Sequence, residues 1–286
     1  MDYWTQRILN QTDRIYNKTT KEAEVELRKL YRESLKQNEQ QMIDVWNSIK
    51  DSENGEIKPN DLYRYNRYFS ISKALQESLR QLGDKEVNVY QRVFESAYKS
   101  QYDFITKMLK EKGITPNTGM MDYSRQVQEV LNSVWCADGK NWSSRIWTNK
   151  ALLVNKLEQG LIECVARGVS KDILVTQIKQ DFNTGFFNAD RIVRTELTYV
   201  QNQACMNRYK DAGIKEFQFL AEIDSRTSDI CRSMNGKIFK IKDAVVGENV
   251  GPLHPFAVAL LYQLSKYKRS IETFNSAWNK CAKINK

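Results

Sequence analysis

The sequence predicts a mainly α-helical protein with a long helical body and a small C-terminal α+β module. Three observations support this fold class. The 286 residues include only 4 prolines and 12 glycines, too few for a turn-rich β architecture. Apolar residues recur at helical spacing as far as Gly213. Beyond Gly213 they occur in short alternating runs, which are typical of strands.

Residues 1–115 are expected to form an N-terminal helical region. One helix is expected to begin near Thr20, because Glu22 and Glu24 would lie at the positive end of its dipole. The polar stretch "DSENGEIKPND" at 51–61 is expected to end this helix. The helices expected after this break cover about 60–82 and 86–112.

Residues 116–213 are expected to be helical as well, because small polar residues that favour helix N-caps precede each apolar periodic segment. The expected caps of three successive helices are Ser143 or Ser144, Ser170 and Asn188. Glycines that favour helix C-terminal positions follow the first and third of these helices, at Gly168 and Gly213.

Residues 214–256 are expected to form the small α+β module. "EFQFLAEID" at 216–224 and "KIFKI" at 237–241 are predicted strands, with a turn and a short helix between them. "VGENVGPLHP" at 246–255 is a predicted loop. Residues 257–286 are expected to be a divergent or out-of-frame basic tail.

No catalytic set is evident in the sequence. The chain has a single histidine, His254, so any catalysis of the Ser-His-Asp or Cys-His type would depend on that residue. A Gly-rich phosphate loop and an HExxH motif are both absent from the sequence. For an enzyme such as an ADP-ribosyltransferase or a nuclease, the only candidate carboxylates are Glu196 and Asp224. We therefore expect no enzymatic activity.

Cys231 and His254 form half of a potential zinc site in the module. Thiolate and imidazole are zinc ligands, but a structural zinc site needs four ligands. No nearby residue supplies the other two, so no cofactor is expected for the sequence as it stands. The alternative is that Cys231 is a buried thiol and His254 a loop imidazole.

The net charge of +9 is concentrated in the tail, since residues 261–286 hold six lysines and arginines against one glutamate. The nearly balanced body predicts at most non-specific DNA contact through phosphates. No apolar run reaches the roughly 18 residues of a membrane helix, so no membrane contact is expected. One cluster could stack on nucleic acid, but such clusters more often pack on a neighbouring helix: Tyr63, Arg64, Tyr65, Arg67, Tyr68 and Phe69.

Several segments occur in a fixed order: "DGKNWSSRIW", "RIVRTEL" with the following Asn202, "GIKEFQFLAEIDSRTSDIC", "NGKIF" and "GPLHP". This series resembles the phage head morphogenesis family, the minor capsid proteins similar to the F protein of phage Mu. The resemblance implies a non-enzymatic protein in the virion head interior that is present in the host cytoplasm during assembly. It implies binding to the portal, major capsid or scaffold protein, and a link to packaging and ejection of DNA.

The sequence departs from this family after "LHP". Members usually continue with Cys-Arg-Cys or Cys-Arg-Ser, whereas this chain has Ala257, Val258 and Ala259. Codons for this run can be read one base earlier as Cys-Arg-Cys-Thr-Thr, so a one-base deletion near Phe256 is one hypothesis. Zinc would then bind only if cysteines were restored at 257 and 259. The other hypothesis is a genuine tail with an amphipathic helix over 262–284.

Overall fold

The computed structural model describes residues 3–50, 67–114, 123–136, 138–167, 170–221, 223, 227–253 and 259–264. Most of these residues are helical, which confirms the mainly α fold class with a small α+β module. The long helices are α1 (Tyr3–Lys50), α3 (Arg67–Glu111), α5 (Trp142–Arg167) and α6 (Lys171–Asp211), and α4 (Tyr123–Asn132) is shorter.

The chain divides into two compact units. The sheet unit consists of Met1–Arg14, Tyr98–Tyr123 and Thr198–Lys286. The bundle unit consists of Ile15–Ala97 and Ser124–Leu197. Each unit therefore combines segments that are far apart in the sequence, and α1, α3 and α6 each contribute residues to both.

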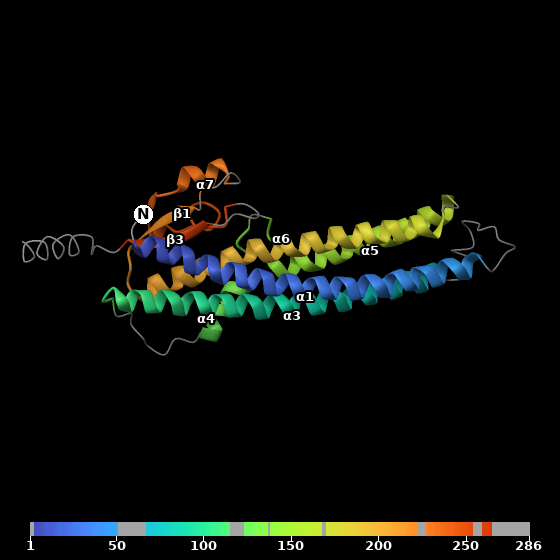
Figure 1. Cartoon of the computed structure of the whole chain (residues 1–286), viewed down its shortest axis with the longest axis horizontal. Helices are drawn as coiled ribbons and strands as arrows, with labels where there is room; N and C mark the ends of the chain where they lie inside the picture. Colours follow the sequence, from blue (N-terminus) through green and yellow to red (C-terminus); the bar gives the residue numbers. More distant parts are fainter. Residues whose placement is uncertain are drawn as a thin grey trace, which may run out of the picture. The chain divides into compact units, whose positions relative to one another are not determined.

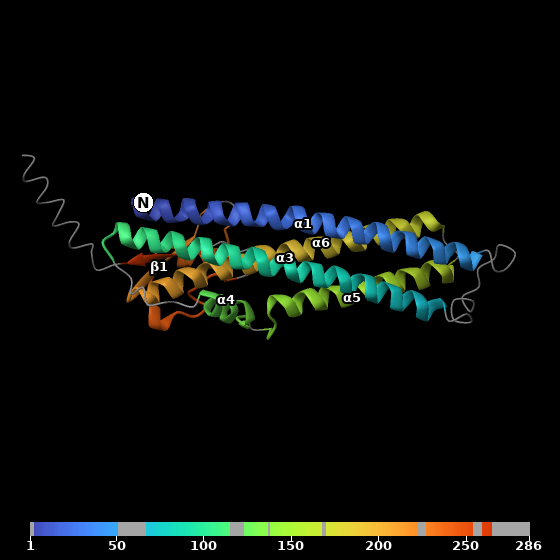
Figure 2. The same ribbon diagram turned by 90° about the horizontal axis from the view of Figure 1, so that it is seen from below.

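In the bundle unit, parts of α1, α3, α5 and α6 run side by side in both views (Figure 1 and Figure 2). A buried polar network lies among three of these helices. Lys150 Nζ of α5 lies 2.5 Å from Glu86 Oε2 of α3, and their side chains are only 5% and 0% exposed. Tyr31 of α1 donates to the same oxygen at 3.2 Å and also contacts Lys150. Because buried charges are costly unless paired, this network favours one pairing of the three helices.

The long helices are more continuous than the sequence suggested. Thr20 does not begin a helix, since it lies inside α1 and its hydroxyl donates to the Tyr16 carbonyl at 2.9 Å. The expected break near 83–85 is also wrong, because α3 runs through it. Asn188 is likewise not a cap but an interior residue of α6. Tertiary packing along these helices outweighs the weak local signals that predicted boundaries.

The predicted helix ends were correct at Ser170 and Gly213 but not at the start of α5. The first turn of α5 is capped by Asn141 rather than by Ser143 or Ser144, because Asn141 Oδ1 accepts from the Ser144 amide at 2.9 Å. Ser170 directly precedes α6 as expected. Gly213 follows α6 with a φ of +68°, the left-handed conformation that glycine adopts readily. Gly168 and the predicted break at 51–61 lie outside the described residues.

The sheet unit contains a three-stranded antiparallel sheet in the order β2-β1-β3. β1 (Glu216–Ala221) lies in the centre, and β2 (Ile238–Lys240) follows the short helix α7 (Asp229–Met234). A one-turn 3-10 helix (Ile241–Asp243) comes after β2. The two strands expected from the sequence are therefore present.

The third strand was not expected. β3 (Ala259–Leu264) comes from the tail and pairs with all six residues of β1, from Glu216 opposite Leu264 to Ala221 opposite Ala259. The tail hypothesis expected a helix to begin at residue 262. Residues 262–264 instead belong to β3. A central strand needs hydrogen-bond partners on both of its edges. β3 supplies the partners on one edge along the whole of β1, and β2 pairs with β1 on the other edge. The rest of the predicted tail helix lies outside the described residues.

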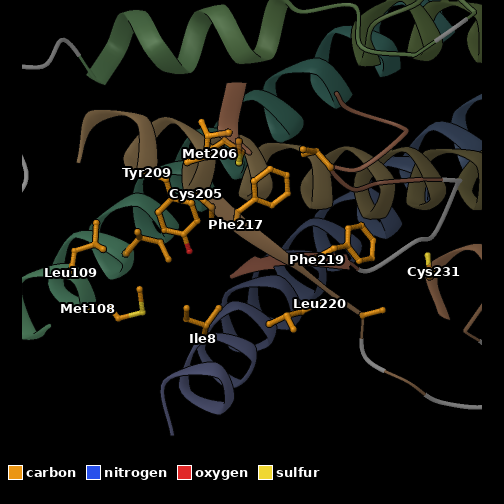
Figure 3. Close-up of a cluster of buried hydrophobic side chains, with 14 residues drawn as sticks. Ile8, Met108, Leu109, Cys205, Met206, Tyr209, Phe217, Phe219, Leu220 and Cys231 are labelled. Atoms are coloured by element: carbon orange, nitrogen blue, oxygen red, sulfur yellow. The ribbon is translucent and has the colours of Figure 1, made fainter. Parts of the chain in front are cut away.

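The core of the sheet unit gathers side chains from four helices and the sheet (Figure 3). Its members include Ile8 of α1, Met108 and Leu109 of α3, Cys205, Met206 and Tyr209 of α6, Phe217, Phe219 and Leu220 of β1, and Cys231 of α7. The small module therefore shares one hydrophobic core with helical segments instead of depending on its own few apolar residues.

Candidate functional site

Glu196 lies on α6 in the bundle unit, and its side chain is only 3% exposed. The indole Nε1 of Trp135 donates to Glu196 Oε2 at 2.8 Å. Arg145 Nε of α5 lies 3.6 Å from Glu196 Oε1. The carboxylate of the "RIVRTEL" motif is thus held by an aromatic donor and a cation that both precede it by at least 51 positions in the chain.

Arg145 also binds the segment between α4 and α5. Its two terminal nitrogens donate to the two carboxylate oxygens of Asp138 at 2.7 and 2.8 Å. Asp138 additionally accepts from the Lys140 amide at 3.1 Å. One guanidinium therefore serves two carboxylates, Asp138 and Glu196, and brings "DGKNWSSRIW" together with "RIVRTEL".

The environment shifts the protonation of both carboxylates. Burial raises the pKa of Glu196 to about 7, while the Trp135 hydrogen bond and the charge of Arg145 oppose this rise. Burial also tends to raise the pKa of Asp138, but the Lys140 amide and Arg145 outweigh it and lower that pKa. Glu196 therefore changes its charge near neutral pH, whereas Asp138 stays ionised.

Of the two carboxylates proposed for the enzyme alternative, only Glu196 is among the described residues. Asp224 lies outside those residues. Arg194, two residues before Glu196, bonds Asp190 at 2.7 Å and pairs with Glu24 of α1 at 3.8 Å, so it belongs to a different contact. The oxygens of Glu196 are occupied by Trp135 and Arg145, which suits a structural contact better than proton transfer to a substrate.

Only one member of the zinc half-site is described. Cys231 of α7 is 3% exposed and belongs to the same core cluster as Val250 and Leu253. His254, which follows Leu253, lies outside the described residues. Within the part of the chain that the structure describes, no group of three or more His, Cys, Asp or Glu residues could hold a metal ion.

Asn202 has a role that the sequence did not reveal. It is fully buried on α6, and its side-chain amide donates to the carbonyl of Gly251 at 3.2 Å. Asn202 thus joins the helix after "RIVRTEL" to the start of "GPLHP", within the sheet unit. The roles of Trp135, Asp138 and Arg145 were also missed, and only the fixed order of the motifs could have suggested them.

Residues 155–257 match the family model described as Phage Mu protein F like protein. The chain carries a Mu F-like segment. This segment covers a little over a third of the chain and includes Glu196, Asn202 and Cys231, whereas Asp138 and Arg145 precede it. The match indicates a phage protein of head morphogenesis, the class that the ordered motifs also indicate. No curated protein and no solved structure matched the chain.

Two further sequence expectations concern partners of the chain. The aromatic cluster proposed for nucleic-acid stacking has its side chains outside the described residues, although Arg67, Tyr68 and Phe69 form the first turn of α3. Among the described helices, none combines the length and the apolar character needed to cross a membrane.

Proposed function

We propose that the protein is a phage minor capsid protein that joins the head during assembly and binds the portal or the capsid shell. The observation that carries this proposal is the Mu F-like match over 155–257. The proposed partners are the portal protein, the major capsid protein and the scaffold protein. The proposed location is the host cytoplasm during assembly and then the interior of the virion head.

In this proposal the protein is not an enzyme, and the polar residues of its motifs serve architecture. Support comes from the two motif contacts, in which Glu196 binds Trp135 and Arg145, and Asn202 binds the Gly251 carbonyl. Both contacts join segments that are distant in the sequence. DNA contact is proposed to be weak and non-specific, through phosphates, because most of the net charge lies in the tail.

The test is the protein content of heads from a phage that carries this gene. Heads and procapsids are purified with and without the portal protein, and their proteins are identified by mass spectrometry. Presence in complete heads with loss from portal-free heads supports portal binding. Presence in both supports binding to the shell. Absence from all heads and procapsids would overturn the proposal.

The enzyme alternative predicts turnover that depends on Glu196. Purified protein is assayed for NAD-dependent labelling of host proteins and for DNA cleavage, with Glu196→Gln as the comparison. We expect no activity for either protein. Activity that the substitution abolishes would favour the alternative over the architectural role.

A further inference from the structure

We propose that the Glu196 carboxyl group is a proton-controlled latch that holds the segment between α4 and α5 against α5 and α6. This latch segment comprises residues 133–136 and 138–141, which form neither helix nor strand. The proposal goes beyond the capsid role, since it concerns a conformational equilibrium within the bundle unit and needs no partner.

Two side-chain contacts fasten the latch segment to different helices. Trp135 donates to Glu196 of α6 at 2.8 Å, and Asp138 accepts the fork of Arg145 of α5. Arg145 also lies within 3.6 Å of Glu196, so the two fastenings share one residue. A change at Glu196 therefore affects both contacts through Arg145.

The charges around the latch favour a proton on Glu196. The segment contributes the ionised Asp138, and α5 contributes the cation Arg145. Lys140 Nζ is directed to the hydroxyl of Thr148 at 3.3 Å, and Cys136 faces Arg145. On α6 the nearest arginine, Arg194, is engaged by Asp190. The buried Glu196 and the 43% exposed Asp138 thus share one guanidinium, and protonation of Glu196 removes the excess negative charge.

The direction of the pH effect follows from the two states. In the closed latch burial raises the pKa of Glu196 to about 7, from an ordinary value of 4.5. Opening exposes the carboxyl to water, so the pKa returns toward its ordinary value and the proton is released. The opening constant should therefore rise roughly tenfold per pH unit between about 5 and 6.5, and level off above about pH 7.5. The latch is tightest in mild acid.

The experiment is amide hydrogen exchange of the full chain between about pH 5.5 and 8.5, corrected for the intrinsic exchange rate at each pH. In peptides that cover the latch segment, we expect protection to fall about tenfold from pH 5.5 to 6.5 and to level off above about pH 7.5. Glu196→Gln, which cannot ionise, should make protection independent of pH. The matched control Glu163→Gln, at an exposed residue of α5, should leave the profile unchanged.

A second variant tests the latch if Glu196→Gln does not fold. Asp138→Asn leaves Arg145 to Glu196 alone, which should lower the pKa of Glu196 and move the transition to lower pH. A flat profile in the unmodified protein would overturn the proposal. A pH-dependent profile that survives Glu196→Gln, or one that Asp138→Asn does not move, would overturn it as well.

Discussion

Gly83 allows α3 to approach α5 closely, and replacing it tests the packing of the bundle unit. A Cβ atom at this position would lie 2.6 Å from Cζ3 and 2.9 Å from Cη2 of Trp147. These separations are well below van der Waals contact, so the indole or the helices must move in Gly83→Ala. Gly160 of α5 is a matched control, because its added Cβ would meet only Gln177 Cγ, at 3.6 Å.

The two substitutions share one favourable contribution and differ in the other. Alanine is favoured over glycine in a helix interior by about 1 kcal/mol, which applies to both positions. Overpacking typically costs about 1–3 kcal/mol and applies only at Gly83. We therefore expect Gly160→Ala to raise the free energy of unfolding by up to about 1 kcal/mol. Gly83→Ala should be neutral or destabilising by up to about 2 kcal/mol.

The assay is urea unfolding followed by circular dichroism, with the variants made in the native chain and in a Trp147→Ala background. In the background that lacks the indole, Gly83→Ala should become stabilising, and the double-mutant cycle should give a coupling of about 1–3 kcal/mol. Gly160→Ala should have the same effect in both backgrounds. Equal stabilisation by Gly83→Ala and Gly160→Ala in the native chain would refute the close approach of α3 to Trp147.

Three further predictions address other parts of the protein. The native chain should not retain zinc, whereas the double substitution Ala257→Cys and Ala259→Cys should bind about one zinc ion through four ligands. Metal analysis by mass spectrometry measures the bound zinc. Adding Cys231→Ser to the double substitution should abolish the restored binding. A fragment of residues 1–264, which keeps β3, should bind duplex DNA only in the weak non-specific range of roughly 10⁻⁴ to 10⁻⁶ M at physiological salt; sub-micromolar affinity in a titration would contradict the charge argument. Lys150→Met leaves a buried carboxylate without its cation and should lower the free energy of unfolding by about 3–5 kcal/mol; a loss below about 1 kcal/mol in denaturant unfolding would contradict the pairing.

The element types could be read from the sequence where local chemistry determines them. Gly213 ends α6 because the chain turns there through a left-handed conformation that other residues disfavour. The roles of the glycines at 83 and 185 were harder to predict, since a glycine inside a helix is usually a destabilising residue. Here each one faces a neighbouring aromatic ring, at Trp147 and Tyr31, so it serves close helix packing rather than a break.

The candidate site was only partly predictable for a different reason. Glu196 and Arg194 lie two residues apart on α6 and make different contacts. The partners of Glu196 are Trp135 and Arg145, and no local pattern encodes contacts between segments so far apart in the chain. β3 was not predicted for a similar reason. Its short apolar run forms a strand only when it pairs with β1.

The composition of the sheet unit sets an order in which the protein can fold during synthesis. The bundle unit is complete once residue 197 has been made, whereas the sheet unit combines Met1–Arg14 with residues from Thr198 onward. Ile8 must therefore wait for Phe219 and the rest of the late core before it can be buried. Contacts of such large sequence separation form slowly, since the intervening chain must be ordered first. During translation the first helical turns can pack early only against Tyr98–Tyr123, and the rest of their core arrives with the last third of the chain.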